Sequence, residues 1–200
     1  IVAGLCLAFG LLELFYGWYR TSRRTLHIQF ATFAILYSGA VLSARAAYGA
    51  GSPVGYLEAE GNTAVFASLA YIALVWFVAT YSEFRPTKVL AVLTGAFVAV
   101  AIAGMFSPDL IVGEAAGVST LELPWGEQVY TYTGEDAALT PLAILAQLAT
   151  LIFLVVATVR KYRRRVKAGG EFLAVGVGWF VATVVADLVV DSGAVDFVYL

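Results

Sequence analysis

A run of positive charge at the end of a long apolar segment constrains this chain more than any other feature. The octet Arg160–Lys167 holds six of the twelve Lys and Arg residues and directly follows the uncharged apolar run Leu142–Val159. Basic residues beside a membrane span are retained on the cytoplasmic side. If the octet is cytoplasmic, every other loop of a multi-span chain acquires a side by alternation.

The composition agrees with a membrane protein, because 61% of the residues are hydrophobic and only 13% are charged. A helix of about 20 apolar residues crosses the hydrocarbon core of a bilayer. The chain therefore predicts an all-α, polytopic transmembrane helix bundle that forms one domain over residues 1–200. The six expected spans cover residues 1–19, 27–48, 63–82, 88–106, 141–160 and 171–190.

The charges divide between the loops in one direction. Eleven of the twelve basic residues lie in the loops after the first, third and fifth spans, and Arg45 is the exception. The remaining loops carry Glu58, Glu60 and the acidic residues of the 107–140 connection, with no Lys or Arg. This asymmetry predicts a multi-pass protein of the bacterial inner membrane with its N-terminus outside. Because the chain also ends outside, we expect a seventh span to follow Leu200 in a longer parent protein.

The outer loop 107–140 is long enough to carry structure of its own. Residues 118–123 and 128–133 are rich in β-forming residues, and they flank the turn-like Pro124–Glu127. We expect a small β-hairpin over the outer mouth of the bundle, with a solvated excursion as the alternative.

Small residues recur every four positions in two of the expected spans, a spacing that lets helices approach closely in lipid. These rows predict tight packing seams in the fourth and sixth spans. Their members are Ala91, Gly95, Ala99 and Ala103, and Ala174, Gly178, Ala182 and Ala186.

Ionisable residues within membrane spans are candidates for function, because they are costly to keep there. Arg45 lies near the outer end of the second span, and Asp187 and Asp191 share one face near the outer end of the sixth. The three residues predict an Arg–Asp pair. It is either a structural salt bridge or the polar floor of an outward-facing ligand pocket.

Four aromatic residues are further candidates for ligand contacts. Trp125, Tyr130 and Tyr132 lie in the outer loop, while Trp179 lies in the middle of the sixth span, where it either packs or forms a pocket wall. We expect a cavity that opens outward beneath the Trp125 loop, bordered by spans two and six. Its ligand would be apolar or amphipathic.

Glu13 lies toward the inner half of the first span and is a possible proton site. The alternatives are snorkelling and a hydrogen bond to a hydroxyl group. His27 is the only histidine and Cys6 the only cysteine, so no metal cluster or bis-histidine haem site is expected within one chain. We expect no catalytic site, no cofactor and no nucleic-acid partner.

The order of features resembles the N-terminal multi-helix, seven-transmembrane-type sensor regions of bacterial sensor histidine kinases and diguanylate cyclases that carry PAS domains. The matching stretches are Trp18-Tyr19-Arg20, Pro124-Trp125-Gly126-Glu127, and Asp187 with Asp191 and the segment 196–200. The resemblance implies a seventh helix that leads to a cytoplasmic output domain in the same chain.

These observations favour a sensory membrane domain that detects a small molecule, a lipid or a membrane state at the outer side. The signal would pass to the output domain through a shift in helix packing, and a homodimer is left open. A small-molecule or proton-coupled transporter that uses Glu13, Asp187 and Asp191 is the alternative. A non-catalytic subunit of a larger membrane complex is the third.

Overall fold

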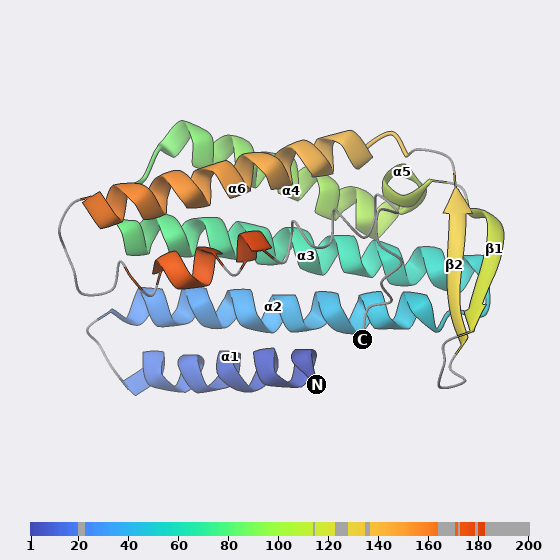
Figure 1. Ribbon diagram of the computed structural model, residues 1–200, viewed down its shortest axis with the longest axis horizontal. Coiled ribbons are helices and arrows are strands. Elements are labelled where there is room, and N and C mark those ends of the chain that lie inside the picture. Colours follow the sequence, from blue (N-terminus) through green and yellow to red (C-terminus); the bar gives the residue numbers. More distant parts are fainter. Residues whose placement is uncertain are drawn as a thin grey trace.

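The computed structural model describes residues 1–19, 23–113, 115–122, 128–134, 137–163, 171, 173–178 and 180–182. Within these residues the chain is a bundle of long helices with shorter helical segments and two strands (Figure 1). The helices are α1 Val2–Tyr19, α2 Arg24–Tyr48, α3 Pro53–Ser82, α4 Thr87–Phe106, α5 Asp109–Val112 and α6 Thr140–Arg163. The strands are β1 Ala115–Glu122 and β2 Gln128–Gly134.

Five helices of the described chain are long and apolar enough to cross a membrane, namely α1, α2, α3, α4 and α6. Their length and composition indicate a membrane protein and confirm the helical class for five of the six predicted spans. A shorter apolar helix, Leu173–Ala182, lies within the sixth, and the rest of that span falls outside the described residues.

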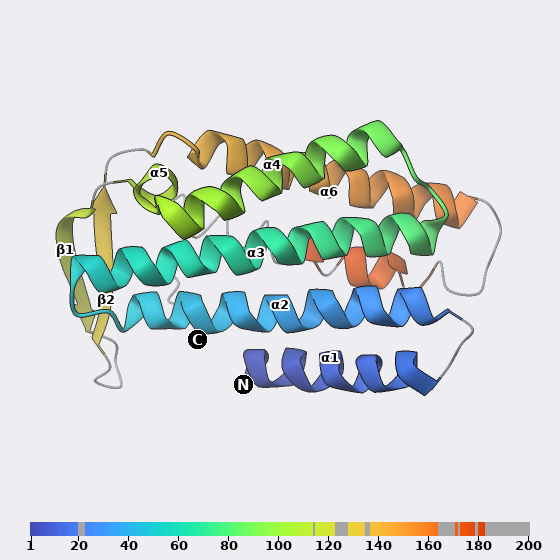
Figure 2. The ribbon, with the colours of Figure 1, turned by 180° about the vertical axis from the view of Figure 1, so that it is seen from behind.

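Successive long helices run in opposite directions, so the bundle has two unlike ends (Figure 1, Figure 2). At one end, here called the basic end, α1, α3 and α6 finish and α2 and α4 begin. The other, called the hairpin end, has the α2–α3 turn, α5, both strands and the start of α6. The described parts of all three predicted cytoplasmic loops therefore meet at one end of the molecule.

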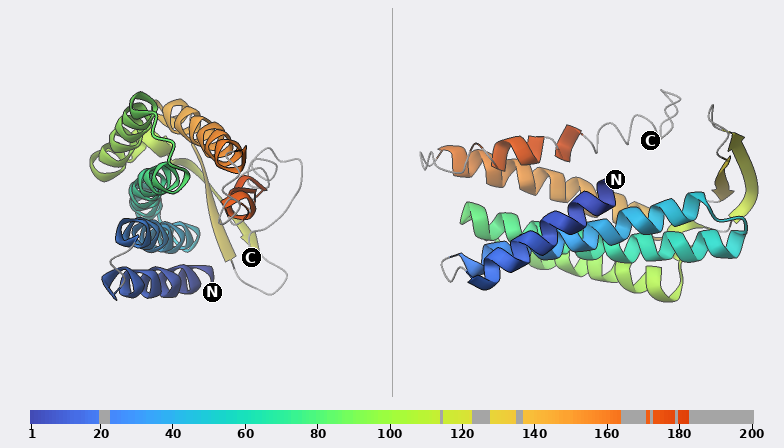
Figure 3. Two further views of the ribbon diagram at one scale, coloured as in Figure 1. Left: turned by 90° about the vertical axis from the view of Figure 1, so that its left-hand side faces the viewer. Right: turned by 90° about the horizontal axis from the view of Figure 1, so that it is seen from below.

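The helix α3 lies at the centre of the bundle. Figure 3 shows α1, α2 and α3 stacked in succession, with α4 and α6 side by side on the far face of α3. The buried core joins α3, α4 and α6 in the basic-end half. Its members include Val75, Val78, Leu90, Leu93, Phe153 and Leu154.

Small residues spaced by seven positions let α1 pack against α2. Ala3, Gly10 and Gly17 are the buried residues of α1. A Cβ on Gly10 would lie 3.2 Å from the carbonyl oxygen of Ala31, which shows how closely the backbones approach. Ser38 of α2 donates a buried hydrogen bond of 2.8 Å to the carbonyl oxygen of Ala3. Close approach and interhelical hydrogen bonds are the interactions that hold helices together in lipid.

The predicted seam of small residues in the fourth span is wrong for three of its four members, since only Ala103 is buried. Ala91, Gly95 and Ala99 are exposed, and a Cβ on Gly95 would meet nothing within 4 Å. In the sixth span Gly178 is also exposed, and a Cβ added there would meet nothing within 4 Å. The reason is that bulky residues of α4, including Leu93 and Phe97, turn the opposite face of that helix toward the core.

The actual close contact between α3 and α4 lies at the hairpin end. A Cβ on Gly61 would lie 2.6 Å from the carbonyl oxygen of Gly104 and 2.9 Å from the Cβ of Pro108. A Cβ on Gly104 would lie 2.8 Å from the carbonyl oxygen of Gly61. Only glycine therefore fits at either position without moving a helix backbone.

The helix α3 begins ten residues before the predicted span. Ser52 caps it by accepting a 3.2 Å hydrogen bond from the backbone N–H of Gly55, and Pro53 occupies the first turn. Both residue types favour these positions at a helix start. As a result Glu58 and Glu60, which the sequence placed in a loop, lie on the first turns of α3.

The long connection after α4 contains a helical turn and two paired strands. The helix α5 was not predicted. The strands β1 and β2 are antiparallel, and their register pairs Val118 with Tyr132 and Thr120 with Tyr130. Both strands lie at the hairpin end of the bundle (Figure 1).

Replacing Gly61 with alanine should lower the free energy of unfolding by about 1–3 kcal/mol, because the added methyl group meets the backbone of α4. Thermal unfolding followed by circular dichroism in lipid nanodiscs measures the change. Gly95→Ala is the matched control, and it should leave the midpoint unchanged or slightly raised, since alanine favours helix over glycine. Equal effects of the two substitutions would contradict the packing described here.

Candidate functional site

The structure places some of the predicted site residues and not others. Asp187, Asp191, Trp125 and Trp179 lie outside the described residues. Tyr130 and Tyr132 are in strand β2, at the hairpin end.

Arg45 is exposed in the last turn of α2, where its charge suits the negative end of the helix dipole. Its pairing with Asp187 or Asp191 stays a prediction, because both aspartates fall outside the described chain.

Glu13 has a partner that the sequence analysis did not propose. Its Oε2 lies 2.6 Å from Nδ1 of His27, and both side chains are a little over one quarter exposed. Of the alternatives given for Glu13, the structure shows a hydrogen bond, and its partner is an imidazole, not a hydroxyl group. The pair could have been predicted from the sequence, because a short connection joins the first two spans and both residues lie near it.

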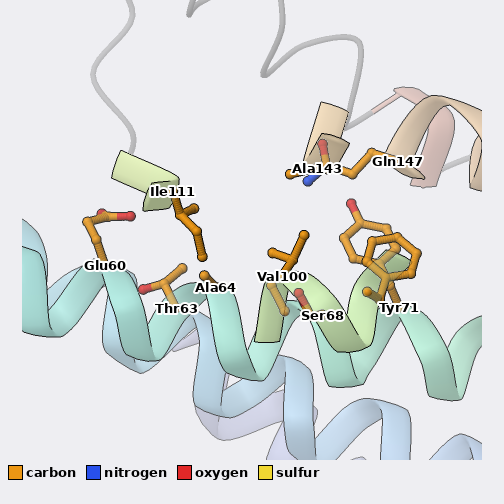
Figure 4. A pocket seen from close by; sticks show the side chains of 11 residues that line it. Glu60, Thr63, Ala64, Ser68, Tyr71, Val100, Ile111, Ala143 and Gln147 are labelled. Atoms are coloured by element: carbon orange, nitrogen blue, oxygen red, sulfur yellow. The ribbon is translucent and has the colours of Figure 1, made fainter. Parts of the chain in front are cut away.

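The described residues line a partly open cavity of about 170 Å³ in the hairpin-end half of the bundle (Figure 4). It lies between α3, α4, α5 and α6. Its lining residues are Glu60, Thr63, Ala64, Ala67, Ser68, Tyr71, Phe97, Val100, Ile111, Ala143 and Gln147. The cavity expected between the second and sixth spans stays a prediction, because the outer part of the sixth span and the Trp125 loop fall outside the described residues.

The cavity exists because one face of α3 carries small side chains. The lining residues of α3 follow the spacing of a single helix face over about three turns. The middle of that stripe is Ala64, Ala67 and Ser68, which are too short to reach α6. Opposite them, α6 contributes the equally short Ala143, so the space between the two helices stays unfilled.

Polar groups lie at both ends of the cavity. Figure 4 shows Glu60 beside Ile111 at one end, and Tyr71 near Gln147 at the other. The ring of Tyr71 stacks on Phe97, with centroids 5.0 Å apart and planes 1° from parallel. A mostly apolar wall with a few fixed polar groups is typical of a small-molecule site.

The volume limits what the cavity can hold. It lies below the ~300–1,000 Å³ of pockets for drug-sized ligands. At about 30 Å³ for a water-sized group, it accommodates five or six such groups. The site therefore fits a few ordered waters or a very small molecule.

The helices that border the cavity are also tied together at the basic end. Lys161 of α6 is only 7% exposed, and its Nζ donates a 3.3 Å hydrogen bond to Oε1 of Glu83. Arg160 lies over the ring of Phe84, with its Cζ 4.7 Å from the ring centroid. Glu83 and Phe84 belong to the turn between α3 and α4, so the end of α6 is held on that turn.

The described residues contain no group of three or more His, Cys, Asp or Glu side chains arranged to hold a metal ion. No protein-family model, curated protein or solved structure matches this chain.

Glu60, Tyr71 and Gln147 are not among the candidate residues predicted from the sequence. The predicted third span begins at residue 63, so Glu60 was expected in a loop. The Ser52-Pro53 pair, a typical helix start, was the signal that would have placed it on α3. Nothing in the sequence identified Tyr71 or Gln147, because their role depends on which faces of α3 and α6 meet.

The Glu13–His27 pair should show energetic coupling. Glu13→Leu and His27→Leu should each lower the free energy of unfolding by about 1–3 kcal/mol, since each leaves a partly buried polar group without its partner. The double variant should be more stable than the sum of the two losses implies, by about 0.5–3 kcal/mol. Unfolding midpoints in nanodiscs give all three values, and simple additivity would show that the two residues do not interact.

Proposed function

We propose that this chain is the membrane-embedded sensory domain of a bacterial signalling protein. It binds a small molecule in the cavity at the hairpin end and passes the signal to a cytoplasmic output domain beyond the basic end. The order of features that resembles bacterial sensor regions supports the proposal, as does the bundle of apolar helices.

One observation carries the proposal. The helices α3, α4 and α6 border the cavity at one end, and the Glu83–Lys161 and Phe84–Arg160 contacts connect them at the other. A ligand that changes the spacing of α6 and α3 at the cavity would change the packing at the basic end, because a helix moves as a stiff body. The ligand drives this change to the extent that it binds one arrangement better than the other.

The proposal includes an orientation. The basic end faces the cytoplasm and the hairpin end faces outward, in the inner membrane, with the β-hairpin over the outer mouth of the bundle. A sixth span over residues 171–190 completes the domain. The gathering of Arg24, Arg85, Lys88 and Arg160 at one end of the bundle supports this orientation.

A proton-coupled carrier is the second candidate, and the Glu13–His27 pair is the observation that favours it. That pair lies between α1 and α2 near the basic end. The cavity lies between other helices near the hairpin end. The two polar sites thus belong to different helix pairs and different halves of the bundle, which favours the sensory function over transport.

Filling the cavity should move the basic end. Ala67→Leu occupies the space between α3 and α6, and we expect it to shift the distance between spin labels on Arg85 and Arg163 by roughly 1–2 Å, the scale of helix shifts in switching proteins. Electron paramagnetic resonance in nanodiscs, on a background in which Cys6 is replaced by serine, measures the distance. Ala99→Leu is the matched control, since Ala99 is exposed on α4. An unchanged distance in well-folded Ala67→Leu protein would show that the cavity is not coupled to the basic end.

Orientation can be tested separately. Reporter fusions should place Arg24, Lys88 and Arg165 in the cytoplasm, and Glu58 and Glu127 outside. A periplasmic position for the octet Arg160–Lys167 would reverse the topology and with it the direction of signalling.

A further inference from the structure

We infer that the cavity binds a small organic cation, a short unbranched aliphatic amine in its protonated form, with Glu60 as the counter-ion. The inference deepens the proposed function by naming the chemical class of the ligand at the same site. It rests on the charge of the cavity lining, the charged residues at the hairpin end and the shape of the cavity.

Among the described residues that line the cavity, Glu60 is the only Asp, Glu, Lys, Arg or His side chain. An opposite charge close by favours the ionised form of a partly buried carboxylate. A ligand ammonium group beside Glu60 supplies that charge, whereas a ligand carboxylate or phosphate would add a like charge.

The charged residues at the hairpin end favour the same sign of ligand charge. Among the described residues at this end, Glu58 and Glu60 of α3, Asp109 of α5 and Glu122 of β1 are acidic, and Arg45 of α2 is basic. A surface of one sign raises the local concentration of oppositely charged solutes. The excess of acidic over basic residues therefore favours a cation over an anion at the end of the bundle where the cavity lies.

The shape selects an unbranched chain. The lining stripe extends over about three turns of α3, yet the whole volume is only about 170 Å³, so the cavity is long and narrow. The hydrocarbon part of the ligand would lie along Ala64, Ala67 and Val100. A chain of five or six non-hydrogen atoms fits the volume, at about 30 Å³ for each water-sized group.

The test compares ligands that share a skeleton and differ in charge. The full chain in nanodiscs of zwitterionic lipid is titrated with n-pentylamine, pentanoate and pentanol, and binding is followed by isothermal titration calorimetry and by the shift in unfolding temperature. We expect n-pentylamine to bind and to raise the unfolding temperature. Pentanoate should give no shift, and pentanol should bind at least tenfold more weakly than the amine.

The chain offers a matched control for the carboxylate. Glu58 lies two residues before Glu60 on α3, is exposed and does not border the cavity. Glu60→Gln should weaken pentylamine binding at least tenfold, while Glu58→Gln should change it less than twofold. If Glu60→Gln fails to fold, Ala67→Leu keeps Glu60 intact, fills the site and should abolish binding by itself.

Several results would overturn the assignment. They are equal binding of pentanoate or pentanol, equal losses in Glu58→Gln and Glu60→Gln, or no binding by any amine from propyl to hexyl. The spin-label experiment uses no ligand, so the two proposals can fail separately. A label shift without amine binding would support the sensory function but would rule out an amine as its ligand. Amine binding without a label shift would support the ligand class but would rule out coupling between the cavity and the basic end.

Discussion

The structure depends on one constraint: in an apolar medium, every backbone N–H and C=O group needs a partner within the chain. Helices meet this need by themselves, but burying apolar area then contributes little to their association, since lipid is apolar too. Association comes from close packing and from a few interhelical hydrogen bonds. The Gly61–Gly104 approach, the Ala3, Gly10 and Gly17 seam, and the Ser38 hydrogen bond are therefore what hold the bundle in register.

The cavity arises from the same small residues that allow this close packing. Small residues on α3 produce a close contact at Gly61, where α4 also presents a glycine, but a gap at Ala64 and Ala67, where α6 does not approach. The same kind of residue thus stabilises one helix pair and opens a site beside it. Glu60 and Tyr71 lie at the two ends of the gap because both belong to the single face of α3 that lines it.

The sequence predicts the long apolar helices well, because length and lack of charge are properties of each segment alone. It locates the ends of α2, α4 and α6 to within a few residues. It does worse where the answer depends on two segments at once. Glu13 and His27 meet only through the register of α1 on α2, and the exposed row of Ala91, Gly95 and Ala99 shows that a small-residue pattern does not reveal which face is buried. The cavity depends in the same way on which face of α3 meets α6.

The length of α3 has a consequence for the lipid around it. Its 30 residues span about 45 Å, against roughly 30 Å of hydrocarbon in a typical bilayer. A helix with this mismatch tilts, or its excess turns stand above the acyl chains, and the balance depends on bilayer thickness. Since Glu60 and the Gly61–Gly104 contact lie in the first turns of α3, a thicker membrane would draw them toward the acyl region. Membrane thickness would then act on the same helix ends that border the cavity.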